Sequence, residues 1–117
     1  MINVGITGHR ALTPMIEGYI RREIRVTLQT QNASDLTGIT CLADGADTIF
    51  AEVVSEMGGR LIVIVPATTY RDNLPAEHHS AYDQLYNQAN EIYRLAFHES
   101  SSKAHMQASR LLTRLIN

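Results

Sequence analysis

The chain has 117 residues, 44% of them hydrophobic, and a formal net charge of −2. This length and apolar fraction predict one packed domain rather than a disordered chain, while the charge and the lack of a long Lys/Arg run argue against general nucleic-acid binding. No apolar stretch approaches the roughly 20 residues that cross a bilayer, and the single cysteine, Cys41, excludes an internal disulfide and favours a cytoplasmic location.

The first part of the chain predicts a strand followed by a helix. Residues 2–6 (INVGI) form a short apolar run that leads into a glycine turn. Thr13-Pro14 is a typical helix start, with Thr13 as the cap and Pro14 in the first turn. The polar segment 29–35 ends this helix. Apolar residues mark one face of the helix at every fourth position, namely Ile16, Ile20, Ile24 and Leu28.

The middle of the chain predicts a second strand, a helix and a third strand. Residues 36–42 form the second strand, and residues 43–47 form a tight turn after it. Gly58-Gly59 is a typical glycine stop for the following helix. The β-branched run 61–65 (LIVIV) indicates a strand covered on both faces, as in a parallel sheet. The helix before it has the clearest apolar spacing in the chain, over Ala46, Ile49, Phe50, Val53, Val54 and Met57.

The last part predicts a loop over 66–75 and a helix from about 77 to 89. Segment 91–97 (EIYRLAF) fits an extension of that helix or a fourth strand, and we favour the strand. A last helix follows a serine cap at 100–102. Because parallel strands need crossover connections, residues 1–117 predict a single α/β domain. Its expected architecture is a Rossmann-like three-layer sandwich, with a mainly parallel sheet of about four strands and helices on both faces.

The loop after the first strand is the first candidate for function, because ligands of such sheets bind beyond the carboxyl ends of the strands. Gly8 lets backbone N–H groups approach a phosphate closely, and the Arg10 guanidinium can bind one bidentately. Thr7 adds a hydroxyl donor, and His9 can stack on a base or donate to an anion. We therefore expect this loop to hold a phosphate-bearing nucleotide; the alternative is a plain turn with a surface arginine.

The loop after the second strand offers a second set of groups. Gly45, Ala46 and the amides that follow lie at a predicted helix N-terminus, where anions are favoured. For Asp44 we favour capping of this helix, with Asp47 as the acid of the first turn, and leave ligand contact open. Because a carboxylate repels a phosphate, Asp44 and Asp47 are better suited to accept hydrogen bonds from ribose hydroxyls.

The third loop begins at Pro66. Tyr70 and Arg71 follow it, and either could flank a base or a phosphate, although a surface position is favoured for Arg71. Of the five histidines, His98 and His105 lie near the predicted end of the fourth strand and the last helix, where either could face the expected ligand site.

Other residues are expected to be structural. His78-His79 lack the i, i+4 spacing of a helical zinc pair and are expected to be solvated, so no metal site is predicted. Cys41, inside the second strand, is expected to be a buried small hydrophobe. Tyrosines at three positions are expected in the core or an interface, namely Tyr82, Tyr86 and Tyr93.

Three segments together resemble the SLOG superfamily: residues 4–10 (VGITGHR), 42–47 (LADGAD) and 61–66 (LIVIVP), with Tyr70 after them. That superfamily includes the Lonely-guy phosphoribohydrolases, once called lysine decarboxylase-like, and the DNA-processing protein DprA. The resemblance implies a Rossmann-like fold and binding of nucleotides or nucleotide-derived signals such as ADP-ribose derivatives. No cofactor is assigned; a nucleotide or phosphate is the candidate ligand.

The sequence departs from these relatives in two ways. It lacks the Pro-Gly-Gly-x-Gly-Thr-x-x-Glu motif of the Lonely-guy enzymes, so no catalytic carboxylate is carried over, and Asp47 or Glu99 would have to supply one. It also resembles only the front two-thirds or so of the family domain, so the C-terminal glycine-rich part is missing. An open side of the first strand is expected to drive homo-oligomer formation through that edge.

We therefore expect binding or sensing of a nucleotide-type ligand. The alternatives are a nucleoside 5′-monophosphate phosphoribohydrolase, or a non-catalytic interaction protein with a degenerate cleft.

Overall fold

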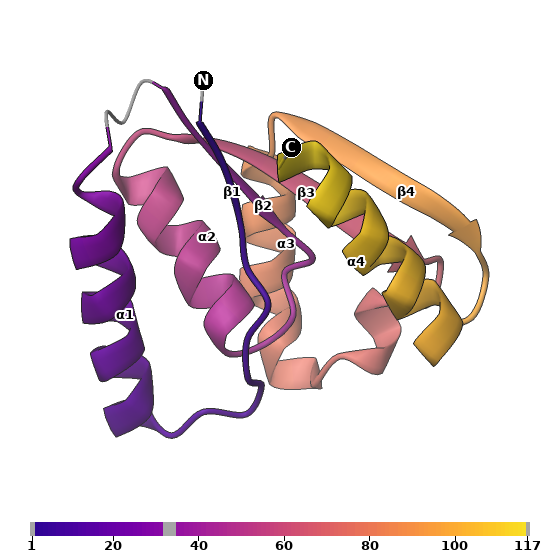
Figure 1. The fold of residues 1–117 in the computed structure, drawn as a ribbon. Coiled ribbons are helices and arrows are strands. Elements are labelled where there is room, and N and C mark those ends of the chain that lie inside the picture. The colour runs from indigo at the N-terminus through magenta and orange to yellow at the C-terminus, as the bar shows by residue number, and fades with distance from the viewer. Residues whose placement is uncertain (1, 32–34, 117) are drawn as a thin grey trace.

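The computed structural model describes residues 2–31 and 35–116. Within these ranges, strands form one parallel sheet in the order β1-β2-β3-β4 (Figure 1). The strands are β1 (Ile2–Gly5), β2 (Leu36–Thr40), β3 (Arg60–Ala67) and β4 (Glu91–Phe97). The predicted α/β architecture with a parallel sheet is confirmed, and segment 91–97 is a strand, as favoured.

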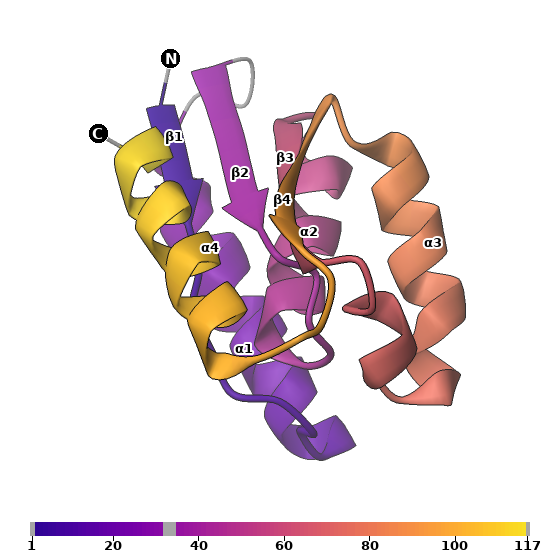
Figure 2. The ribbon, with the colours of Figure 1, turned by 90° about the vertical axis from the view of Figure 1, so that its right-hand side faces the viewer.

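Helices cover both faces of the sheet, but unequally. The helices are α1 (Pro14–Leu28), α2 (Ala46–Glu56), α3 (His79–Gln88) and α4 (Ser102–Ile116), and short 3₁₀ turns occur at η2 (Arg71–Asn73) and η3 (Ala76–His78). Along the chain, each new strand lies on the same side of the strand before it. Right-handed crossovers therefore place α1, α2 and α3 on one face of the sheet. Figure 2 shows α4 on the opposite face, where it crosses back from β4 toward β1. This is a three-layer sandwich.

The run Leu61–Ile64 shows why β3 is apolar without interruption. Successive strand residues point to opposite faces, and here both faces are covered. Leu61 and Val63 pack toward α2 and its neighbours, whereas Ile62 and Ile64 pack toward α4. On the α4 side the contact partners are Ala108 and Leu112, whose spacing is one helix turn.

The first strand and the last helix of the described chain contact each other. The Asn3 side chain on β1 donates a hydrogen bond of 2.7 Å from Nδ2 to the carbonyl oxygen of Leu115 on α4. A Cβ at Gly5 would press on Leu112 and Ile116, so this position on β1 lets α4 pack close to the sheet.

Several predicted boundaries change. β2 ends at Thr40 rather than Leu42, because Leu42 has a φ of 57°, a left-handed conformation that a strand cannot continue through. β3 extends to Ala67 through Pro66, where the register with β4 shifts and the missing N–H is tolerated. The predicted polar segment 29–35 includes residues 32–34, which lie outside the described ranges. No helix in the described part of the chain is long and apolar enough to cross a membrane.

Candidate functional site

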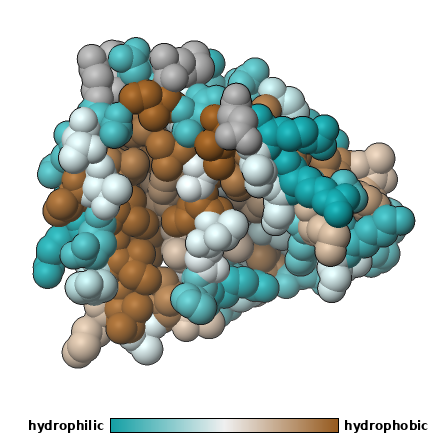
Figure 3. All heavy atoms as spheres, in the orientation of Figure 1, coloured by the Kyte–Doolittle hydropathy of each residue, from teal (hydrophilic) through white to brown (hydrophobic). Residues whose placement is uncertain are grey.

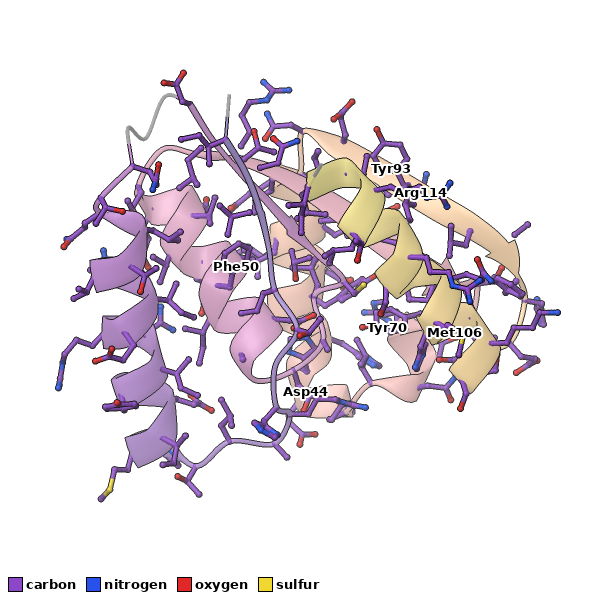
Figure 4. All side chains as sticks on the ribbon, in the orientation of Figure 1. Asp44, Phe50, Tyr70, Tyr93, Met106 and Arg114 are labelled. Carbon is purple, nitrogen blue, oxygen red and sulfur yellow. The ribbon has the colours of Figure 1, made fainter. Side chains whose placement is uncertain are left out.

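A cavity of about 250 Å³ lies at the carboxyl ends of β1, β2 and β3, beneath α4. We call it the cleft. Six predicted ligand residues line it: Thr7, Gly8, Arg10, Asp47, Pro66 and Tyr70. Residues of α4 close its other side, among them His105 and Ser109. Figure 4 shows Tyr70 beneath α4, with Asp44 in the neighbouring loop.

The first two loops pack directly on each other instead of forming opposite walls of a cleft. The amide of Ala46 donates to the carbonyl oxygen of His9 at 3.1 Å. A Cβ at Gly8 would overlap the Cβ of Ala46, and one at Gly45 would overlap the His9 carbonyl oxygen. Gly45 also has a φ of 92°, which favours glycine. Loop contact therefore accounts for both glycines, and the His9 carbonyl oxygen occupies one amide at the start of α2.

Asp44 corrects a prediction. The N-cap of α2 is Gly45, and no side chain caps the helix, so Asp44 does not have the expected capping role. Its carboxylate instead accepts a hydrogen bond of 2.7 Å from Nε of Arg10 and one of 3.2 Å from the amide of Ala11. Burial raises the pKa of Asp44, but the Arg10 and Ala11 hydrogen bonds outweigh it and hold that pKa below its ordinary value. Within the described ranges, the terminal nitrogens of Arg10 have no hydrogen-bond partner.

Asp47 is the buried acid of the cleft. Its side chain lies in the first turn of α2, and the residue is 8% exposed. Burial raises its pKa to about 6, although hydrogen bonds from the amides of Ala43 and Cys41 partly oppose the shift. A carboxyl that titrates near neutrality inside a cleft can accept or release a proton at physiological pH.

Cys41 lies just beyond β2, not inside it as predicted, and lines the cleft. Burial, and then the negative charge of Asp47, raises the pKa of its thiol to about 12. The thiol is therefore protonated at neutral pH and is a poor nucleophile. The expected role as a small hydrophobe agrees with this chemistry.

Two aromatic rings, one of them on α4, meet at the α4 side of the cleft. The Tyr70 ring is nearly perpendicular to the His105 ring, with centroids 5.8 Å apart. The Tyr70 side chain is buried, which raises the pKa of its phenol and keeps it neutral. His105 is in turn held by the Ser100 hydroxyl, whose Oγ lies 2.8 Å from Nε2. From the sequence, His105 was one of two histidines that could face this site, and Ser109 was not predicted. The two residues are one helix turn apart on α4 and line the cleft together with Ala108.

The remaining predicted site residues lie elsewhere. Asp44 and Gly45 line a second hollow of about 290 Å³ between α1, α2 and η3. His9 and Ala46 contact each other at the loop junction. Arg71 does not line the cleft. Its guanidinium instead donates two hydrogen bonds of 2.7 Å to the carboxylate of Asp83.

The prediction that the adjacent histidines at the junction of η3 and α3 are solvated is wrong. His78 is buried, and its Nε2 lies 2.9 Å from the carbonyl oxygen of Leu42, the residue whose left-handed conformation ends β2. His79 is half-buried, with Nε2 3.1 Å from the carbonyl oxygen of Leu74. Both are structural rather than solvated. No group of three or more His, Cys, Asp or Glu in the described ranges could hold a metal ion.

Comparison with known proteins finds no matching family model and no matching curated protein. The resemblance to the SLOG superfamily therefore stays a prediction that rests on the three sequence segments.

Proposed function

We propose that the chain binds a nucleotide or a nucleotide-derived phosphate ligand, of the ADP-ribose type, in the cleft beneath α4. The observation that carries the proposal is the position of this cavity at the carboxyl ends of three parallel strands, where sheets of this kind bind ligands. The SLOG-like segments contribute residues to the same lining, which is why we retain that resemblance as part of the proposal.

The lining offers different chemistry at its two ends. Tyr70 and His105 provide aromatic surface for a planar base. The Arg10 side chain is half-exposed, and its terminal nitrogens have no hydrogen-bond partner within the described ranges, so it suits a phosphate. Asp47 lines the same cleft and suits a ribose hydroxyl, because a carboxylate accepts hydrogen bonds. The volume of about 250 Å³ is just below the roughly 300–1,000 Å³ of ordinary small-molecule sites, which favours one nucleotide moiety inside the cleft.

Asp44 sets a condition on this proposal. Its carboxylate compensates the charge of Arg10, so an incoming phosphate has to share or displace that interaction. Phosphate recognition by Arg10 is therefore weaker than recognition by an unpaired arginine, and the aromatic wall has to supply more of the affinity.

A second candidate function is cleavage of a nucleoside 5′-monophosphate to the free base. The observation that favours it is Asp47, a buried carboxyl in the cleft with a pKa of about 6. The other candidate, Glu99, has a side chain that is 74% exposed, lies 3.5 Å from His98 and does not line the cleft. Release of adenine from AMP, lost in Asp47→Asn, would support this function; no release at high protein concentration would reject it.

The binding proposal is tested by thermal unfolding with AMP, ADP-ribose and inorganic phosphate as probes. A ligand at a hundredfold excess over its Kd stabilises the folded state by about 2.7 kcal/mol. We expect stabilisation by at least one nucleotide probe and a smaller stabilisation of Arg10→Ala by the same probe, because the aromatic wall still contributes affinity. Arg60→Ala is the matched control, because Arg60 is an exposed arginine at the start of β3, the opposite end of the strand.

If no nucleotide probe raises the unfolding temperature, ligand binding is rejected. The remaining alternative is then the non-catalytic interaction protein.

A further inference from the structure

The outer edge of β1 has no neighbour in the described part of the chain. β1 pairs with β2 on one side only, in parallel register from Ile2–Leu36 to Gly5–Ile39. Backbone N–H and C=O groups along an open strand edge can pair with another strand, and such edges are ready sites of association.

The helix beside this edge is apolar on its outer side. Arg21 and Arg25 form ion pairs with Glu52 and Glu56 on α2, which identifies the side of α1 that faces α2. On the side away from α2, Ile16, Tyr19 and Val26 follow one stripe of the helix and are 44%, 58% and 57% exposed. An apolar stripe on a helix ordinarily packs against other protein rather than facing water.

Apolar surface continues from this stripe onto the strand. Ile2 on β1 is 39% exposed, and Ile116 at the end of α4, beside Gly5, is 40% exposed. In Figure 3, which faces the β1 edge, hydrophobic side chains form a band between α1 and β1. The exposed apolar residues thus border one open strand edge from both faces of the sheet, and contiguous patches of this kind mark interaction sites.

We propose that this edge and the α1 stripe bind a second copy of the chain around a two-fold axis perpendicular to the sheet. The open edge can accept a strand beside β1 together with a helix beside α1, and the β1–α1 unit of another copy is such a pair. A perpendicular two-fold axis places β1 antiparallel to its counterpart and keeps both α1 helices on the same face. The surface is then self-complementary, as a two-fold dimer interface has to be.

The charges on α1 agree with a self-pairing helix. Arg22 and Glu23 are adjacent, exposed and opposite in charge. In an antiparallel pair of α1 helices centred between them, Arg22 faces the partner's Glu23, and Tyr19 faces the partner's Val26. The same antiparallel arrangement of the two α1 helices therefore places opposite charges against each other and apolar side chains against each other.

The test measures the mass of the unmodified chain and of a Tyr19→Glu/Val26→Glu variant by sedimentation at several concentrations up to millimolar. We expect the unmodified chain to reach twice its mass of 13.0 kDa, and the variant to remain a monomer because four carboxylates would meet in the dimer. Met106→Glu is the matched control: Met106 is 54% exposed on α4, outside the α1 stripe, and its variant should still dimerise.

Circular dichroism of each variant checks that the fold is kept, as expected for substitutions at exposed positions. A monomeric unmodified chain at millimolar concentration overturns the proposal. A dimer that persists in the folded double variant also overturns it. Neither result depends on ligand binding, so this test is independent of the proposed function.

Discussion

Nε of Arg10 lies 2.7 Å from Oδ1 of Asp44, and this contact joins the loop after β1 to the loop before α2. The two residues are 34 positions apart in the chain. The same contact that orders the first loop also reduces the positive charge available to a ligand, so stability and phosphate affinity oppose each other here.

Replacing Asp44 by Asn is expected to strengthen phosphate binding. Asparagine can keep a hydrogen bond with Arg10 or Ala11 but removes the negative charge, so affinity for AMP should rise by the worth of a surface ion pair, about 0.5–1 kcal/mol, or a few-fold. Titration calorimetry measures this change. Asp83→Asn is the control, because Asp83 forms an ion pair with Arg71 outside the cleft; equal effects of the two variants would contradict a phosphate site at Arg10.

Gly8→Ala is expected to destabilise the fold. The added methyl would overlap the Cβ of Ala46, and overpacking of this kind costs about 1–3 kcal/mol. Denaturant unfolding measures the loss. Gly18→Ala is the contrast, since a Cβ there meets nothing within 4 Å and alanine in a helix interior should stabilise by about 0.5–1 kcal/mol.

The double variant Gly8→Ala/Ala46→Gly provides a further check on this contact. It should recover part of the stability lost in Gly8→Ala, because removing the Ala46 methyl makes room for the new one. Purely additive losses would mean that the two loops do not touch there.

Asp47 predicts a pH dependence of stability. Its pKa is raised from the ordinary 3.8 to about 6 in the folded chain, so between these values the folded state binds more protons than the unfolded state. Stability should therefore fall as pH rises from about 4 to 6, by up to about 3 kcal/mol. Urea unfolding across this range should show a smaller fall in Asp47→Asn, which cannot ionise. An unchanged slope in that variant would place the titration elsewhere.

His105→Ala should weaken binding of AMP with little effect on folding. The histidine is exposed, packs nearly perpendicular to the Tyr70 ring and lines the cleft, so its removal takes away part of the aromatic wall. Loss of a stacking contact with a base is worth about 1–3 kcal/mol, which titration calorimetry can resolve. His98→Ala serves as the control, because the His98 side chain is 75% exposed and lies outside the cleft.

Local patterns were sufficient to predict most of the fold. The run 61–65 indicated a strand covered on both faces, and the structure buries its alternate residues on the two sides of the sheet. Segment 91–97 was ambiguous because a short apolar run fits a helix or a strand. What decides it is pairing with β3, a contact between distant segments that periodicity does not encode.

The candidate site was less predictable because its contacts are not local. Asp44 looked like a helix cap, but the alternative partner, Arg10, is brought to it only by the parallel pairing of β1 and β2. His78 looked solvated, yet it is buried against the carbonyl oxygen of Leu42. Ser109 was not predicted because nothing in its spacing shows that α4 crosses back over the sheet.

The hydrogen bond between Asn3 and Leu115 closes a loop of 112 residues, whereas the strand pairs connect neighbours along the chain. Closing a long loop costs more chain entropy than closing a short one, and contacts distant in sequence tend to form late. We therefore expect α4 to dock after the sheet and α1–α3 have assembled. Because α4 supplies one wall of the cleft, an intermediate without docked α4 would have no complete site, and a bound ligand would oppose the undocking of α4.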